Sequence, residues 1–239
     1  MCGRFADYFE AEQLAEEFGA SRLLDAPGPS FNVAPTSQIR VVRDTPAGAD
    51  GLVRELRGAR WGLVPAWAKD PAAGPRLVNA RSETVTVKPS FRAAARSRRA
   101  LVPAAGYFEW RDNPTGPKTP YFLHPPGGGP IGMAGLYEWW WPPGQAAGAA
   151  EARAGRAEAL LSATVITRAA TDLTGWVHDR MPLIVPREAW SDWLDPDLRD
   201  PGAVQRLIAA LPDPELAPRP VGRAVGSVRN NGPHLIAPA

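Results

Sequence analysis

Short segments with strand character recur along the whole chain and constrain its fold more than any other feature. They are rich in β-branched and aromatic residues or alternate apolar and polar positions, as strands do. The segments are QIRVVR (38–43), LVRELRGARWGLV (52–64), RALVPAAGYFEW (99–110), TPYFLH (119–124), IGMAGLYEWW (131–140), ALLSATVIT (159–167), PLIV (182–185) and RPVGRAV (219–225). Strands therefore dominate at irregular spacing, which favours an α+β fold with a mainly antiparallel, barrel-like sheet and peripheral helices.

Helical patterns stand between these strand segments. EAEQLAEEFGA (10–20) predicts a short amphipathic helix that starts at a capping box of Asp7 and Glu10 and ends near Gly19. Three further helices are predicted at PSFRAAARS (89–97), PREAWSDWL (186–194) and AVQRLIAAL (203–211). The PPGGGP stretch (125–130) predicts a turn between two strands.

No internal repeat and no clear domain boundary interrupt this pattern, so we expect a single domain over 2–236. The low-complexity stretch 142–158, rich in Ala and Gly, is predicted to be a surface insertion within that domain. No apolar run approaches the roughly 20 residues of a membrane span, and the first residues lack the basic and apolar regions of a signal peptide. We therefore expect a cytoplasmic protein with no membrane partner.

The titratable residues exclude some classes of site. One cysteine cannot form an internal disulfide framework or a thiolate-rich metal site, and His124, His178 and His234 show no ligand spacing. We expect no metal, no cofactor and a monomer. Only three of the 27 basic residues are lysines. Arginine side chains bind phosphate groups well, although the codon usage of a GC-rich genome is the better explanation for the abundance of arginine. Nine tryptophans exceed compositional drift and could include platforms for base stacking.

The only cysteine stands at position 2, directly after the initiator Met1. A small residue there usually allows Met1 to be removed, which would give Cys2 a free α-amine beside its thiol. Their reference pKa values of about 8 and about 8.5 leave some of each nucleophile near pH 7. This pair can condense with an aldehyde to an imine and then a thiazolidine, or the thiol can attack an amide with the amine as base. From position alone, a buried Cys2 packed as a hydrophobe is the simpler interpretation.

Several polar clusters are out of character for core or loop. They are CGRF (2–5), FNVAPT (31–36), WGLVPAWAKD (61–70), NARSET (79–84), YFEW (107–110) and VHDRMP (177–182). Glu109 of YFEW lies between aromatic residues at the end of an apolar strand, where desolvation would raise the pKa of its carboxyl toward the range of a general acid. Taken alone, Glu109 would more often face solvent and His178 would more often be structural.

Taken together with VTVKPSFR (85–92) and VGSVRNNGPHLI (225–236), these clusters resemble the SOS-response-associated peptidase (SRAP) family, whose members shield abasic sites in single-stranded DNA. The likeness runs from Cys2 to about Ile236 and is interrupted mainly by the 142–158 stretch. Ordered blocks of this kind are far more specific than any single motif. The resemblance implies an SRAP-type fold, single-stranded DNA with abasic sites as the partner, and association with the nucleoid when the protein is bound to damaged DNA.

The resemblance also implies roles for residues. Cys2, freed of Met1, attacks the ring-opened sugar aldehyde of an abasic site and remains attached as a thiazolidine, a self-modifying reaction of the DNA damage response. Asn79 orients the Cys2 terminus, and Glu109 and His178 handle protons. Lyase and (auto)peptidase activities are further implied.

For the DNA contacts, the resemblance implies that Arg4 and Arg81 hold flanking phosphates and that Trp67 packs near the bases. Thr167 is a weaker candidate for the wall of the site. Two positions depart from the family pattern: Ala105 stands where members usually carry Asp, and Thr171 where they carry Asn. Both flank the site, so they bear on rate or DNA contacts more than on reaction type.

Two other functions stay open from the sequence. A true N-terminal-nucleophile cysteine peptidase or amidohydrolase would turn over a peptide or amide through an acyl-enzyme. A non-covalent DNA-binding module would bind intact and abasic strands alike and would not need Cys2.

Overall fold

The structure is a computed structural model that describes residues 2–48, 51–143, 159–170 and 172–239. Thr171 and all of the predicted insertion except its first two residues lie outside these ranges. The fold is α+β with extensive antiparallel sheets, as the sequence predicts, and its strands form two sheets. Among the described helices, none combines the length and the apolar character that crossing a bilayer requires.

The smaller sheet, called sheet A here, is antiparallel throughout. Its strands, in spatial order, are β14 (Ala217–Pro220), β9 (Gly116–His124), β8 (Gly106–Asn113), β1 (Phe5–Asp7) and β3 (Ser30–Val33). The first strand of the chain therefore lies inside the sheet, where it pairs with β8 on one side and β3 on the other.

The larger sheet, sheet B, curls until its strands form a ring. Its spatial order is β12 (Arg180–Pro182), β11 (Leu160–Ala169), β10 (Ile131–Trp140), β7 (Arg99–Ala104), β4 (Gln38–Pro46), β5 (Leu52–Trp61) and β2 (Arg22–Leu24), with β13 (Ile184–Val185) on β10 and β6 (Asn79–Arg81) on β11. A parallel pairing between β11 and β5 closes the ring. Parallel pairs also join β6 to β11 and β2 to β5.

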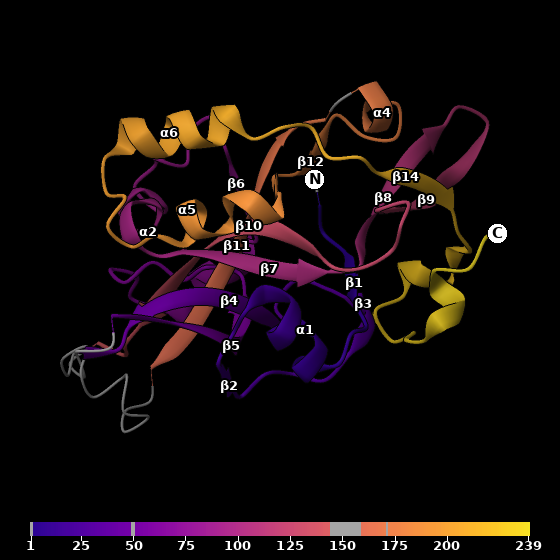
Figure 1. Cartoon of the computed structure of the whole chain (residues 1–239). Coiled ribbons are helices and arrows are strands. Elements are labelled where there is room, and N and C mark those ends of the chain that lie inside the picture. Colours follow the sequence, from indigo (N-terminus) through magenta and orange to yellow (C-terminus); the bar gives the residue numbers. More distant parts are fainter. Residues whose placement is uncertain (1, 49–50, 144–158, 171) are drawn as a thin grey trace.

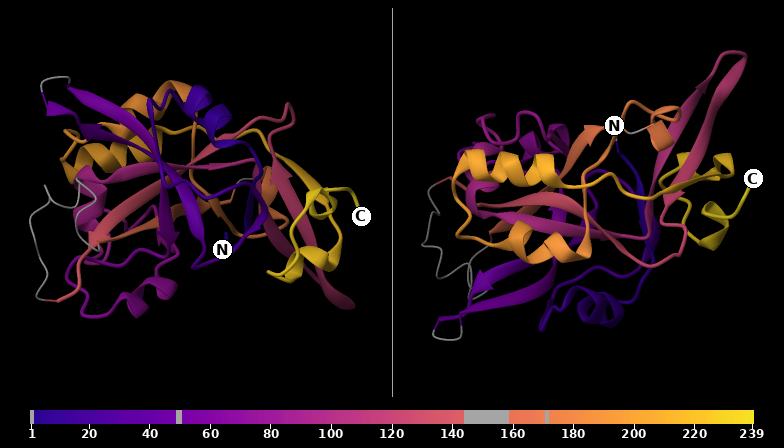
Figure 2. Two further views of the ribbon diagram at one scale, coloured as in Figure 1. Left: turned by 90° about the horizontal axis from the view of Figure 1, so that it is seen from below. Right: turned by 45° about the horizontal axis from the view of Figure 1, so that its top comes forward.

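The helices are short and cover the outside of the sheets (Figure 1). They are α1 (Ala11–Phe18), α2 (Arg92–Ser97), α4 (Asp172–Gly175), α5 (Trp190–Leu194) and α6 (Pro201–Ala210), with 3-10 turns η2 (Pro71–Arg76), η3 (Arg187–Ala189), η4 (Arg223–Gly226) and η5 (Pro233–Leu235). Helices α2, α5 and α6 lie together on one side of sheet B, while the β8–β9 hairpin and the C-terminal turns lie at the other end of the molecule (Figures 1 and 2).

Two predicted elements differ from the structure. RALVPAAGYFEW is not one strand but two, since β7 belongs to sheet B and β8 to sheet A. The break falls at Ala105, and β8 begins at Gly106, where only glycine fits because a Cβ would lie 2.5 Å from the carbonyl oxygen of Leu123. RPVGRAV is a strand only as far as Pro220 and then becomes the 3-10 turn η4.

The start of α1 also differs in its polar contacts. Glu10 occupies the N-cap position without a side-chain hydrogen bond, while Gly19 ends the helix in the left-handed conformation, as predicted. Asp7 makes no capping box. It is buried and forms an ion pair with buried Arg40, whose Nη1 lies 3.3 Å from its Oδ1. The Asp7 carboxylate, which the sequence pattern predicts as part of a helix cap, therefore pairs with Arg40 instead.

Candidate functional site

Cys2 lies just before β1, at the point where the two sheets meet. Its side chain is fully buried in an apolar cluster that includes Trp61, Tyr107 and Met181. Burial raises the pKa of the Cys2 thiol, and the negative charge of Glu109 raises it further. The thiol therefore keeps its proton at neutral pH and would need a nearby group to accept that proton before it could attack.

Asn79 holds the segment that contains Cys2. It is the first residue of β6, whose parallel pairing with β11 sets Asn79 opposite Val165. Asn79 Nδ2 donates a hydrogen bond of 2.7 Å to the carbonyl oxygen of Cys2. Its Oδ1 is buried and accepts no hydrogen bond from the described residues. The Asn79 amide group thus fixes the backbone of Cys2 through Nδ2, and its Oδ1 remains available to accept a hydrogen bond.

Glu109 reaches the same place from β8. Glu109 is only 4% exposed, although its side chain is ionisable. Burial raises the pKa of the Glu109 carboxyl, against the opposing positive charge of His178. Glu109 is therefore close enough to both the thiol and the imidazole for their charges to interact. A carboxyl that holds its proton to higher pH than usual can serve as a proton donor.

Tyr107 is a member of this cluster that sequence reasoning missed. Side chains on a strand alternate between faces, so Tyr107 shares a face with Glu109. It is 1% exposed. Burial raises the pKa of its hydroxyl, with further contributions from the charges of Cys2 and Glu109 and an opposing hydrogen bond with Thr174. The two-residue spacing in YFEW was the signal that could have identified it.

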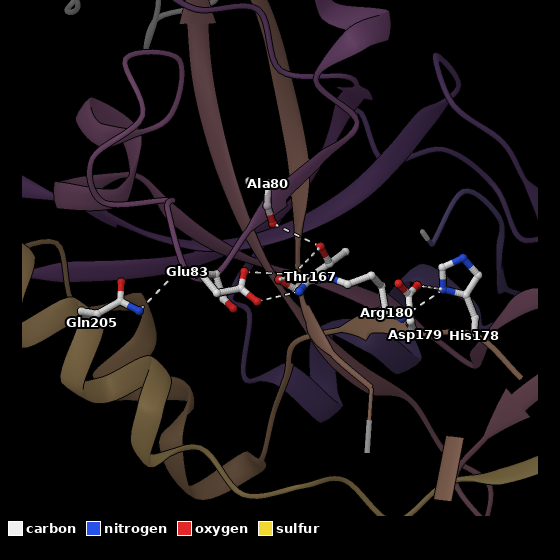
Figure 3. A network of polar contacts seen from close by, with 8 residues as sticks. Ala80, Glu83, Thr167, His178, Asp179, Arg180 and Gln205 are labelled. Atoms are coloured by element: carbon white, nitrogen blue, oxygen red, sulfur yellow. Dashed lines mark hydrogen bonds and ion pairs between the residues drawn. The ribbon is translucent and has the colours of Figure 1, made fainter. Parts of the chain in front are cut away.

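His178 lies at the edge of the cluster with 29% of its side chain exposed. Its Nδ1 lies 3.0 Å from the backbone nitrogen of Arg180 and 2.9 Å from Oδ1 of Asp179 (Figure 3). A neutral Nδ1 can accept from the Arg180 N–H, whereas a protonated Nδ1 can donate to the carboxylate. His178 therefore has a suitable partner in either protonation state.

An ion-pair brace holds the NARSET segment against the HDRMP segment. Arg180 Nη1 and Nη2 donate to the two carboxylate oxygens of Glu83 at 2.5 and 3.0 Å, and Nη2 also donates to the backbone oxygen of Thr167 at 2.7 Å (Figure 3). The hydrogen bonds from Arg180 hold the pKa of Glu83 down at about 2. Because Asn79 and His178 belong to the two braced segments, the pair fixes their relative position.

The predicted DNA-contacting residues fall into two groups. Trp67 is 68% exposed and Arg81 is exposed on β6, so both can reach a ligand. Arg4 uses Nη1 to bond Asn32 Oδ1 at 2.8 Å and the Val225 oxygen at 2.7 Å, and thereby joins β3 to η4. Thr167 is fully buried beside Arg180. Arg4 and Thr167 thus make contacts within the protein, so replacing either residue would disturb those contacts as well as any contact with DNA.

No cluster of three or more His, Cys, Asp or Glu side chains in the described ranges is arranged to hold a metal ion. Ala105, which flanks the site, is buried directly after β7. The side chains brought together by the fold are therefore a thiol, an amide, a carboxyl, a phenol and an imidazole.

The family model described as "SOS response associated peptidase (SRAP)" matches residues 1–228. The chain belongs to the SRAP family. The abasic site processing protein YoqW of Bacillus subtilis (strain 168) is 34% identical, with 99% of each chain covered. The abasic site processing protein YedK of Escherichia coli (strain K12) is 32% identical, with 100% of each covered.

Two solved structures share this fold. A protein from Bacteroides thetaiotaomicron superimposes with a TM-score of 0.80 at 22% identity, covering 100% of both chains. A phage-related protein from Bordetella bronchiseptica gives a TM-score of 0.65 at 26% identity over 92% of this chain and 94% of the other. The two-sheet arrangement around Cys2 is thus a fold shared with solved proteins.

Proposed function

We propose that this SRAP protein processes abasic sites in single-stranded DNA by forming a covalent cross-link through Cys2. YoqW and YedK, which match this chain over 99% and 100% of their own length, are named abasic site processing proteins. The observation that most supports a covalent reaction is the Asn79 amide, which holds the Cys2 carbonyl and keeps a buried oxygen available. That oxygen suits the N–H of a free Cys2 amine, and an amide can hold an amine without protonating it.

The reaction starts when removal of Met1 frees the α-amine of Cys2. The amine attacks the aldehyde carbon of the ring-opened sugar and forms a carbinolamine. Glu109 in its neutral form gives a proton to the carbinolamine oxygen, which leaves as water, so that a protonated imine (iminium) remains. The Cys2 sulfur then bonds to the imine carbon and passes its proton to the Glu109 carboxylate. The products are a thiazolidine, one water and a Glu109 in its starting state.

The surrounding residues have supporting roles in this proposal. Holding amine, thiol and aldehyde together replaces a bimolecular encounter with an intramolecular one. His178, with a partner for either protonation state, relays protons and assists opening of the finished ring. Arg81 contacts a flanking phosphate and Trp67 a base, with Arg4 and Thr167 supporting the same surface.

Two variants at the Cys2 terminus test this proposal. A variant that keeps one residue in front of Cys2 has no free Cys2 amine, so it should form no adduct while it remains folded. Cys2→Ser keeps the amine and should give an imine that borohydride reduces, together with some strand cleavage by β-elimination. The measurement is a denaturing gel of protein incubated with abasic single-stranded DNA, and thermal unfolding of each variant is the control.

The outcomes separate the candidate functions. A retained-residue variant that cross-links at the normal rate would exclude the thiazolidine. Release of peptide or amide product with no DNA adduct would identify a peptidase or amidohydrolase. Equal binding of intact and abasic strands, independent of Cys2, would identify a non-covalent module.

A further inference from the structure

A second group of side chains continues outward from Glu109 along the β8–β9 hairpin. Glu109 and Tyr121 are direct partners across the two strands, and the next same-face pair toward the tip is Arg111 and Thr119. Tyr121 is therefore the immediate neighbour of the buried carboxyl, and Arg111 is one step further out. The hairpin projects from the body of the protein beside α4 (Figure 2).

Trp176 lies over this face of the hairpin. Its ring meets Tyr121 edge-on, with centroids 5.1 Å apart and an interplanar angle of 85°. The guanidinium carbon of Arg111 lies 4.9 Å from the centre of the same ring. Trp176 is nevertheless 45% exposed and stands two residues before His178. A large apolar ring is thus held in a defined orientation at the surface, adjacent to the candidate site.

The charge of this group fits a polyanion. No acidic residue in the described part of the chain forms an ion pair with Arg111, whereas the neighbouring Asp112 is paired with Lys118 at 2.9 Å. A hollow of about 210 Å³ beside Arg111 and Tyr121 extends the surface toward the tip of the hairpin. An aromatic ring next to a guanidinium is the combination that stacks a base and neutralises its phosphate.

We propose that Trp176 and Arg111 form a binding site for one flanking arm of the DNA strand, on the side where it leaves Glu109 along the hairpin. Trp176 stacks on a base of that arm and Arg111 contacts the adjoining phosphate. This inference rests on the proposed function, because it assigns a path to the strand whose abasic nucleotide meets Cys2. Trp67 and Arg81 belong to other segments and are not part of this arm site.

The test uses single strands that contain a reduced abasic site, which has no aldehyde, so that binding is measured without cross-linking. Three probes are needed: one with both arms, one truncated on the 5′ side and one truncated on the 3′ side. Trp176→Ala should weaken binding of the two-armed strand about 5- to 100-fold. It should weaken one truncated strand similarly and leave the other, which lacks the relevant arm, unchanged.

Three companion variants sharpen the result. Trp176→Phe should retain most of the affinity because it keeps a ring. Arg111→Gln should lower the slope of log affinity against log salt by about 0.7, as expected for one lost phosphate contact, while Trp176→Ala leaves that slope unchanged. Leu52→Ala is the matched control, because Leu52 is 48% exposed at the start of β5, a strand of sheet B, whereas the hairpin belongs to sheet A.

Unchanged affinity of Trp176→Ala for the two-armed strand, or equal losses for both truncated strands, would overturn the arm site. The proposed function is judged separately, by whether the wild-type protein cross-links the unreduced abasic strand. A wild-type protein that cross-links while Trp176→Ala binds normally would refute only this inference.

Discussion

Two glutamates of this protein are equally buried, at 4% exposure, yet they have opposite surroundings. Glu55 on β5 accepts from Arg43 Nε at 2.6 Å and from Arg57 Nη1 at 3.3 Å. Both arginines in turn lie over aromatic rings, Arg43 over Tyr137 at 4.6 Å and Arg57 over Trp139 at 4.9 Å. A buried carboxyl group enclosed by two guanidinium groups has permanently charged partners, and its role is structural.

Glu109 is buried beside a thiol, a phenol and an imidazole instead, and burial raises the pKa of its carboxyl. The imidazole of His178 can gain or lose its charge, whereas a guanidinium cannot. The two glutamates are therefore equally buried but have different roles. Permanent positive charge around Glu55 supports structure, and titratable neighbours around Glu109 leave a proton that can be exchanged.

Glu109→Gln should produce the largest effect. The amide keeps the shape and hydrogen bonding of the side chain but has no proton to transfer, so adduct formation should slow by about 100-fold or more. Single-turnover cross-linking of abasic single-stranded DNA measures the rate. A variant with the wild-type rate at every pH would show that Glu109 is not the acid and that the proton path runs through His178.

Glu55→Gln should have the opposite profile. Removing the carboxylate leaves buried Arg43 and half-buried Arg57 without this acidic partner, which should lower the free energy of unfolding by about 3 kcal/mol. The cross-linking rate per folded molecule should not change. Urea unfolding of Glu55→Gln beside Glu109→Gln measures the difference, and equal stabilities of the two variants would contradict the distinction drawn between the two regions.

The smallest effect concerns the pH dependence of stability. Burial raises the pKa of Glu109 in the folded protein above its ordinary value of 4.5, so the folded state keeps this proton to higher pH than the unfolded state. Between those two pKa values the wild type loses stability as pH rises. Glu109→Gln cannot ionise and avoids this loss. In urea unfolding measured from acidic to neutral pH, the variant should therefore gain stability relative to wild type, and a constant difference would contradict the raised pKa.

Much of the fold could be predicted from local patterns. The strand segments at 38–43 and 131–140 and the helix ended by Gly19 follow from side-chain periodicity and glycine conformation, which act within a few residues. The division of RALVPAAGYFEW between two sheets could not be predicted, because it depends on pairing with strands distant in the sequence: β7 pairs with β10 and β4, and β8 pairs with β1 and β9. Likewise, only the folded chain shows that Asp7 pairs with Arg40.

The candidate site divides in the same way. Cys2, Asn79, Glu109 and His178 stand in motifs that a sequence displays directly, and the fold brings them together. Tyr107 and Trp176 were missed because their importance comes from neighbours on other strands. The brace between Arg180 and Glu83 joins segments far apart in the sequence and carries no local pattern. Motifs therefore identify reactive groups, and pairing between strands identifies what positions them.

If this protein becomes attached to DNA through Cys2, as we propose, the position of β1 inside sheet A has a mechanical consequence. Any pull on the DNA would enter the protein just ahead of this strand, which hydrogen-bonds to β8 and β3 at once. Extracting β1 would break both pairings and remove Phe5 from its contact with Trp61 in the buried cluster. A polymerase or helicase that meets such a cross-link would therefore have to pull out a strand that is paired on both sides, rather than peel off an edge strand, before the attached protein could unfold.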